Sequence, residues 1–208
     1  MTPSVPRLPS ADALLAQVPL IGRMLAAMLL LCSALLALVE SRAAILRGGT
    51  EIRLRTVPVD PRDLFRGDYV VLAYDISRVT SGKLVGDKRL RRGDKLYVQV
   101  ANGSDGFAEL RSVSTQRPAG TEPVLIARVV ALPGCRGDGT AFDCSGPDAR
   151  IHLAYGLESY FVPQSEGRRI ETTPKARIEV VAAVAGDGTA AIKRLLIDGK
   201  LVYAEPPY

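Results

Sequence analysis

A chain of 208 residues that is 47% hydrophobic, with a mean hydropathy of +0.12, is apolar for a soluble protein, although charged residues make up 24% of it. The net charge is +5, but only 5% of the residues are aromatic and none is Trp, so the stacking faces that single-stranded nucleic acids need are scarce. Lys and Arg are scattered apart from the run at 88–92, which is typical of a solvated turn, and we therefore expect no nucleic-acid partner.

The apolar excess is concentrated between Leu20 and Val39, where Arg23 is the single charged residue. A helix of this length covers about 30 Å, the thickness of the hydrocarbon core of a bilayer. We therefore predict a transmembrane anchor over residues 20–41, in contact with lipid. Residues 1–19 are rich in Pro and have little periodicity, and we expect them to form a short cytoplasmic tail.

A cleaved signal peptide is the alternative interpretation of the same run. Ser41-Arg42-Ala43 places small residues at the spacing that a signal peptidase needs. The apolar run is long for a signal peptide, however, and Glu40 and Arg42 are poorly placed beside the cleavage position. These features favour a retained anchor.

Strand-like patterns follow over residues 48–208, which we predict to be one β domain. Apolar and polar residues alternate in the segment 51–59, and Val70, Leu72, Tyr74 and Ile76 share one face of the segment 69–76. Further strands are expected at 95–102, 124–132, 149–155, 176–185, 189–197 and 200–205. Hairpin turns are expected at 185–188 and 198–199, and one short helix at 164–172. Short strands separated by turns predict a mainly β fold, a β-sandwich or a β-barrel-like domain, after the N-terminal helix.

Cys135 and Cys144 enclose a short Gly-containing loop, and we predict a disulfide between them. A zinc site needs about four ligands, and His152 is the single His in the sequence. Disulfides persist outside the cytosol, so the pair favours an extracytoplasmic domain. The arginines that follow the apolar run outnumber those before it, which favours the opposite orientation, although long domains cross membranes despite such charges. We give the cysteine pair more weight and expect the β domain to lie outside the cytosol.

Arg-Gly-Asp occurs three times, at 66–68, 92–94 and 136–138, and two interpretations are open. An adhesive loop would have to protrude from the domain. Turn formation requires no protruding loop, because Gly adopts positive φ angles at little energetic cost and Asp accepts local backbone hydrogen bonds. We expect a turn at each copy, with Gly67 at a positive φ angle.

The stretch GDYVVLAY resembles the signature of the bacterial GDYXXLXY protein family, through Gly67, Asp68, Tyr69, Leu72 and Tyr74. A second stretch at 155–171, YGLESYFVPQSEGRRIE, is also similar to that family, with Gln164 as a mild departure. The resemblance implies a membrane-associated protein of unknown biochemical activity that is encoded near multi-pass membrane proteins. Together with the anchor and the cysteine pair, it leads us to expect a single-pass protein of the bacterial inner (cytoplasmic) membrane with a periplasmic domain.

Our functional hypothesis is an accessory domain without catalytic residues that docks onto an integral membrane protein. The surface we expect to dock is formed by Tyr155, Glu158, Tyr160 and Phe161, since aromatic side chains with polar neighbours are typical of interface centres. A core position for the same aromatic residues is the alternative. The sequence indicates no metal site and no cofactor.

A hydrolase is the competing hypothesis, and the Arg-Gly-Asp loops leave an adhesive protein as a third. RGDYVVL and ARVVALPG resemble two boxes of the type-I signal peptidases, which use a Ser nucleophile and a neutral Lys. The Lys position of the box is Ala127 here, and Ser41 is the single Ser between the anchor and the first box. Neither half of the dyad is therefore recognisable, so we name no catalytic residue.

The anchor prediction is tested by the mass of the chain extracted from membranes. Because the apolar run is long enough to span the bilayer, we expect the extracted chain to retain it. A membrane-derived chain that begins near Ala44 would contradict the prediction.

Overall fold

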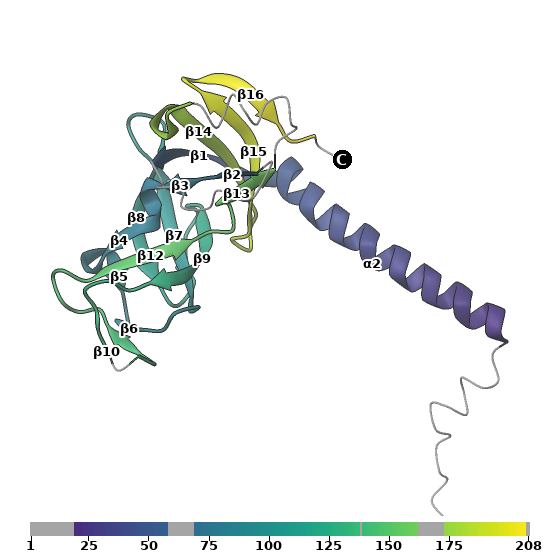
Figure 1. Ribbon diagram of the computed structural model, residues 1–208, viewed down its shortest axis with the longest axis horizontal. Helices are drawn as coiled ribbons and strands as arrows, with labels where there is room; N and C mark the ends of the chain where they lie inside the picture. The colour runs from purple at the N-terminus through teal and green to yellow at the C-terminus, as the bar shows by residue number, and fades with distance from the viewer. Residues whose placement is uncertain (1–18, 58–68, 138, 162–172, 207–208) are drawn as a thin grey trace, which may run out of the picture. The chain divides into compact units, whose positions relative to one another are not determined.

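The computed structural model describes residues 19–57, 69–137, 139–161 and 173–206, with only the backbone described for 69–71, 160, 161 and 175. It is mainly β, with one long N-terminal apolar helix and a nearly closed barrel-like sheet, which confirms the predicted fold class (Figure 1). The chain divides into two units, 1–42 and 43–208, and each is described by itself.

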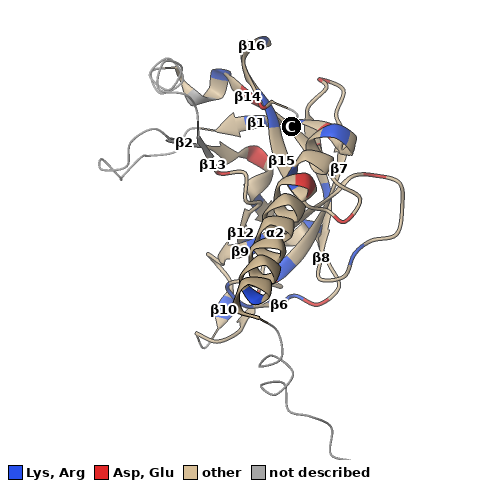
Figure 2. Ribbon diagram, turned by 90° about the vertical axis from the view of Figure 1, so that its right-hand side faces the viewer, with Lys and Arg blue, Asp and Glu red and all other residues tan. Residues whose placement is uncertain are grey.

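Helix α2 (Leu20–Gly48) exposes its large apolar side chains throughout the predicted anchor, Leu30 at 67% and Leu36 at 69%. Figure 2 shows the helix uncharged through its middle. The hydroxyl groups of Ser33 and Ser41 donate to the carbonyl oxygens of Leu30 and Leu38, so these polar groups are satisfied within the helix. The helix is long and apolar enough to cross a membrane, a property that a signal sequence shares.

The last turns of α2 belong to the β unit, because Ala43 and Leu46 are buried at 1% and 3% exposure. Gly49 follows, and its N–H donates to the carbonyl oxygen of Ile45 at 2.9 Å. A Cβ atom at Gly49 would lie 2.6 Å from that oxygen and 3.0 Å from the Cβ atom of Ala183. The helix therefore passes into the first strand without a linker.

A five-stranded sheet has the order β16-β15-β14-β1-β3, and its described pairs are antiparallel. Its strands are β1 (Thr50–Val57), β3 (Ala73–Tyr74), β14 (Ile178–Val184), β15 (Ala190–Ile197) and β16 (Lys200–Ala204). The hairpin turns expected at 185–188 and 198–199 join β14 to β15 and β15 to β16. Asp198 and Gly199 have φ angles of 49° and 75°, as a two-residue hairpin turn requires.

A six-stranded sheet has the order β4-β12-β9-β7-β8-β5 and completes the barrel-like wall. Its strands are β4 (Arg78–Thr80), β5 (Leu84–Val85), β7 (Lys95–Asn102), β8 (Ala108–Ser114), β9 (Val124–Ala131) and β12 (Arg150–Ala154). The alternation places Leu96, Val98 and Val100 of β7 inside, each at 0% exposure. Both sheets contribute to one hydrophobic core, which includes Leu54, Leu125 and Ile178.

Within its described residues the β unit also contains two small sheets and three 3₁₀ turns. β6 (Arg89–Leu90), β10 (Arg136–Gly137) and β11 (Phe142–Asp143) form one sheet, and β2 (Tyr69–Val71) pairs with β13 (Ser159–Phe161) in the other. The 3₁₀ turns are η1 (Asp75–Ser77), η2 (Ser81–Lys83) and η3 (Lys175–Arg177). The helix expected at 164–172 lies outside the described residues.

The segment 69–76 is not the single strand that its alternation predicts. Strand β2 pairs with β13, whereas β3 pairs with β1, so the chain changes partner at Leu72 and then enters η1. Leu72, Tyr74 and Ile76 are nevertheless all buried, as a shared face predicts. Local alternation fixes the buried face, whereas the identity of the pairing strand is set by residues far away in the sequence.

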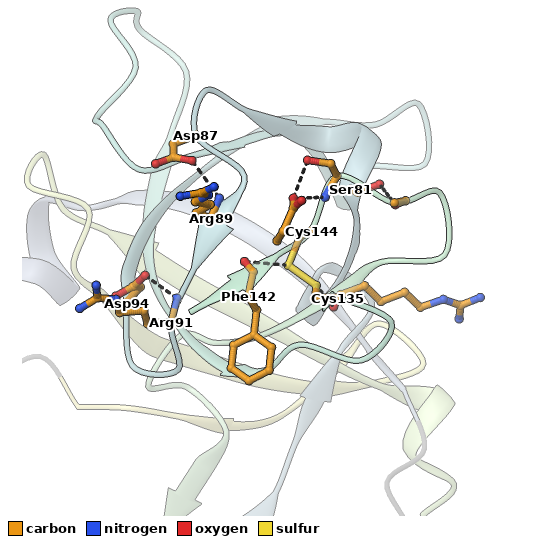
Figure 3. The surroundings of a disulfide bond; sticks show 12 residues. Ser81, Asp87, Arg89, Arg91, Asp94, Cys135, Phe142 and Cys144 are labelled. Atoms are coloured by element: carbon orange, nitrogen blue, oxygen red, sulfur yellow. Dashed lines mark hydrogen bonds between the residues drawn. A yellow bond between two sulfur atoms is a disulfide. The ribbon is translucent and has the colours of Figure 1, made fainter. Parts of the chain in front are cut away.

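Cys135 and Cys144 form a disulfide, with their Cα atoms 4.5 Å apart (Figure 3). Cys144 is fully buried, and its N–H donates to the carbonyl oxygen of Lys88 at 2.9 Å. The disulfide therefore attaches the β10–β11 hairpin to the core. Cys32 is a free thiol on α2.

The second and third Arg-Gly-Asp copies differ in geometry at their described residues. In the second, Gly93 has a φ angle of 88° and the Asp94 carboxylate accepts the Arg91 N–H at 2.7 Å, which is the expected turn (Figure 3). In the third, Gly137 lies in strand β10, where a Cβ atom would lie 2.6 Å from the Phe142 ring. The prediction of a turn at the third copy is therefore wrong at Gly137. A glycine is needed there because the backbone lies close to the Phe142 ring. Asp138 and the first copy, 66–68, lie outside the described residues.

Gly49→Ala should destabilise the β unit, by about 1–3 kcal/mol, because the added methyl group overlaps backbone atoms. Gly48→Ala is the matched control, since a Cβ atom there meets nothing within 4 Å. Thermal unfolding of the two variants in the same detergent measures the difference. Equal unfolding midpoints would contradict the tight junction.

Candidate functional site

The two segments that carry the family resemblance lie side by side. Strand β2 pairs with β13 in antiparallel register, Val71 opposite Ser159 and Tyr69 opposite Phe161. The pairing continues one residue further, where the Leu72 N–H donates to the carbonyl oxygen of Glu158 at 2.8 Å. Segments more than 80 residues apart in the sequence therefore meet along one short ladder.

Two tyrosines fasten the segments to each other reciprocally. The Tyr74 hydroxyl donates to the carbonyl oxygen of Leu157 at 2.6 Å, and the Tyr155 hydroxyl donates to that of Ile76 at 2.6 Å. Tyr74 is 0% and Tyr155 7% exposed, so both bonds are made inside the core. We call this pair of hydrogen bonds the tyrosine interlock.

Glu158 stabilises the turn in the second segment that contains Tyr155, the donor of one interlock bond, and Leu157, the acceptor of the other. Its carboxylate accepts the N–H groups of Tyr155 at 2.5 Å and Gly156 at 2.8 Å. Gly156 has a φ angle of 77°, a conformation that favours glycine. The turn directs the Leu157 carbonyl toward Tyr74, so Glu158 supports the interlock from within its own segment.

Burial raises the pKa of the Tyr74 hydroxyl well above its usual range, and the nearby Glu158 charge adds to the shift. Burial likewise raises the pKa of Tyr155, with smaller contributions from Glu158 and Asp75. Desolvation also raises the pKa of Asp75, against the opposing effect of a hydrogen bond from the Ile76 N–H. Both phenols therefore stay protonated near neutral pH, where they act as hydrogen-bond donors.

The structure brings four of the residues singled out from the sequence into this region, namely Leu72, Tyr74, Tyr155 and Glu158. Tyr155 is buried, and the Glu158 carboxylate accepts hydrogen bonds from backbone N–H groups of its own segment. Both side chains therefore stabilise the fold. Gly67 and Asp68 lie outside the described residues, as do the side chains of Tyr69, Tyr160 and Phe161.

The acceptors of the interlock were not identified from the sequence. They are the backbone carbonyls of Leu157 and Ile76, and no side-chain pattern marks a carbonyl as an acceptor. The one available signal was the presence of a Tyr in each of the two segments, since a buried Tyr hydroxyl requires a partner.

The positions that the peptidase boxes would use have other surroundings. Ala127 is buried in β9 at 1% exposure, and the Ser41 hydroxyl donates to the Leu38 carbonyl within α2 at 2.7 Å. Among the described residues, no group of three or more His, Cys, Asp or Glu side chains could hold a metal ion.

A long apolar helix followed by a mainly β unit, with two interlocked tyrosine segments, defines a helix-plus-β class of protein. Residues 31–195 match the family model described as GDYXXLXY protein, and the chain belongs to this family. The match includes both interlocked segments. No curated protein and no solved structure matches the chain.

Tyr74→Phe and Tyr155→Phe should each lower the free energy of unfolding by about 1–3 kcal/mol, because each leaves a buried carbonyl without its donor. Tyr97→Phe, on β7 and away from the interlock, is the control and should change stability by less than about 0.5 kcal/mol. Since the folded phenols have raised pKa values, the wild-type protein should lose stability as pH rises above about 10, where tyrosines of the unfolded chain ionise.

The double variant Tyr74→Phe/Tyr155→Phe should lose less stability above pH 10 than the wild type, in chemical denaturation measured across that pH range. Wild-type stability in either single variant, or an unchanged alkaline slope in the double variant, would contradict the interlock.

Proposed function

We propose that α2 anchors this protein in the bacterial inner membrane and that the β unit acts outside the cytosol as an accessory domain without catalytic residues. In this proposal residues 1–19 are a cytoplasmic tail, 20–41 the anchor and 48–208 the docking domain. The partner is a multi-pass integral membrane protein.

One observation carries the proposal. Only Glu40, Ser41 and Arg42 separate Val39, the last residue of the apolar run, from Ala43, the first buried residue of the β unit. Four helical steps advance about 6 Å. A chain anchored through α2 therefore ties its β unit to the membrane through a short connection, within reach of the extramembrane loops of neighbouring membrane proteins.

Two further features support the same assignment. The disulfide between Cys135 and Cys144 is of a kind that persists outside the cytosol. Confinement to one membrane also makes weak docking sufficient, because a tether raises the effective concentration of a nearby partner toward about millimolar when the geometry permits contact.

The docking surface of this proposal is centred on Tyr160 and Phe161. Both residues belong to β13, beside the interlock, and the preceding Ser159 is exposed. Tyr155 and Glu158 contribute indirectly, because their bonds hold the segment from which β13 begins.

Replacing Tyr160 and Phe161 with Ala should reduce recovery of the partner when the full chain is purified from membranes after mild crosslinking. The matched control is Val85→Ala with Val130→Ala, which removes apolar side chains that are 58% and 55% exposed on the six-stranded sheet. Unfolding midpoints of both variants establish that the β unit stays folded.

Undiminished recovery from a folded Tyr160→Ala/Phe161→Ala variant would contradict this surface. Peptide or ester turnover by the purified protein, abolished by a single substitution, would contradict the accessory role and support a hydrolase.

A further inference from the structure

A β-bulge in the five-stranded sheet directs two consecutive cations to one side. Val181 of β14 is opposite Arg194 of β15, but the next residue, Ala182, is opposite Ile192, so Lys193 has no opposite residue on β14. A regular strand would turn Lys193 and Arg194 to opposite faces. Here both side chains pair with Glu51 on β1. The Lys193 ammonium lies 2.9 Å from one carboxylate oxygen of Glu51, and the Arg194 guanidinium contacts the other oxygen.

The bulge borders an open cleft of about 470 Å³ on the outer face of the five-stranded sheet. Glu51, Arg53 and Arg194 contribute its charged lining, and Val181, Leu196 and Leu201 its apolar lining. Leu201, on the edge strand β16, is 59% exposed. The cleft therefore offers cations next to an apolar surface.

The cations that line this cleft exceed the carboxylates that line it. Glu51 is shared by Lys193 and Arg194, and Glu179 pairs with Arg53 at 2.9 Å. Among the residues that line the cleft, two cations, Arg53 and Arg194, against one carboxylate, Glu51, leave one positive charge. An ammonium has three donors and a guanidinium five, so the bonds to Glu51 leave donors of Lys193 and Arg194 available for another oxyanion.

The chain places this cleft close to the end of α2. Glu51 comes two residues after Gly49, which packs against the last turns of the helix. Arg53 and its opposite residue Val181 lie about 10 Å along the strands from Thr50, the first residue of β1. If residues 20–41 are embedded, the last turns of α2 and these strand residues are all that separates the cleft from the membrane along the chain.

We propose that the cleft lined by Arg53, Arg194 and Leu201, with Lys193 beside it on Glu51, binds the phosphate-bearing headgroup of an anionic phospholipid. Lys193 and Arg194 contact the phosphate, and Leu196 and Leu201 contact the apolar glycerol and upper acyl region. This inference rests on the membrane anchoring in our proposed function, but it requires no protein partner.

A lipid fits the cleft better than an acidic peptide for two reasons. The surrounding leaflet supplies lipid continuously at the end of α2, so even weak affinity produces occupancy. The ligand charge required is also small, since one excess cation matches the single charge of a phosphodiester. An acidic segment of a protein is the alternative occupant, and the experiment distinguishes the two.

The test uses the full chain in phosphatidylcholine nanodiscs that contain a trace of photoactivatable phosphatidylglycerol, with crosslinked peptides identified by mass spectrometry. We expect crosslinks on β15 and β16. Lys193→Gln and Arg194→Gln should each lower crosslinking about five-fold, the equivalent of about 1 kcal/mol for one basic residue near an anionic surface. Arg111→Gln, which removes the same charge from β8, is the control and should leave crosslinking unchanged.

Four outcomes would overturn the proposal. The first is equal crosslinking by a phosphatidylcholine probe, which would mean mere proximity to the bilayer. The second is unchanged crosslinking in Lys193→Gln and Arg194→Gln variants whose unfolding midpoints match the wild type. The third is loss of the crosslinks on adding inorganic phosphate, which would indicate a site for free phosphate. The fourth is a crosslink that appears only after a co-purified protein is removed, which would indicate a peptide occupant.

The failure of this inference is distinguishable from that of the proposed function. Recovery of the chain outside the membrane fraction would contradict the membrane anchoring on which the lipid site and the proposed function both depend. A membrane-bound chain that captures its partner but gives no selective lipid crosslink would remove the lipid site alone.

Discussion

The β unit depends on the reciprocal hydrogen bonds between Tyr74 and Tyr155 and the backbone of each other's segment. Tyr74 ends β3, which pairs with β1 in the five-stranded sheet, whereas Tyr155 directly follows β12 in the six-stranded sheet. The bonds therefore join the two sheets where the chain passes between them. A Phe at either position would preserve most of the apolar burial and lose the connection, which gives Tyr74 of the family signature a physical reason.

Local patterns in the sequence were sufficient for much of the fold and for little of the site. Alternation located β7 at 95–102 without error, because a strand with one buried face has a period of two. It did not identify β8, whose exposed Glu109 and Arg111 dilute the apolar signal. The change of partner at Leu72 depends on strands far away in the sequence, and the bulge at Lys193 depends on the register of the neighbouring strand β14. The alternation within one strand therefore contains neither.

The arginines after the helix show why counting charges gave a conflicting orientation. Arg53 pairs with Glu179 and Arg55 with Asp105, and both guanidinium groups lie within 5 Å of the Phe107 ring centre, at 4.8 and 4.5 Å. These two residues hold the β7–β8 loop against β1. Cations that a folded domain uses internally give no independent information on which side of a membrane the domain lies, so their weight in such a count should be reduced.

The position of β1 within its sheet determines the order in which the domain can form during synthesis. Thr50 is opposite Val184, and Arg53 reaches Glu179 across 126 residues of sequence. The first strand to emerge after the helix must therefore wait for the last third of the chain before it gains its main neighbour. Contacts of such high sequence separation slow folding and leave a strand edge exposed in the meantime. Nascent chains of this architecture should accordingly depend on chaperones until β14 has been translated.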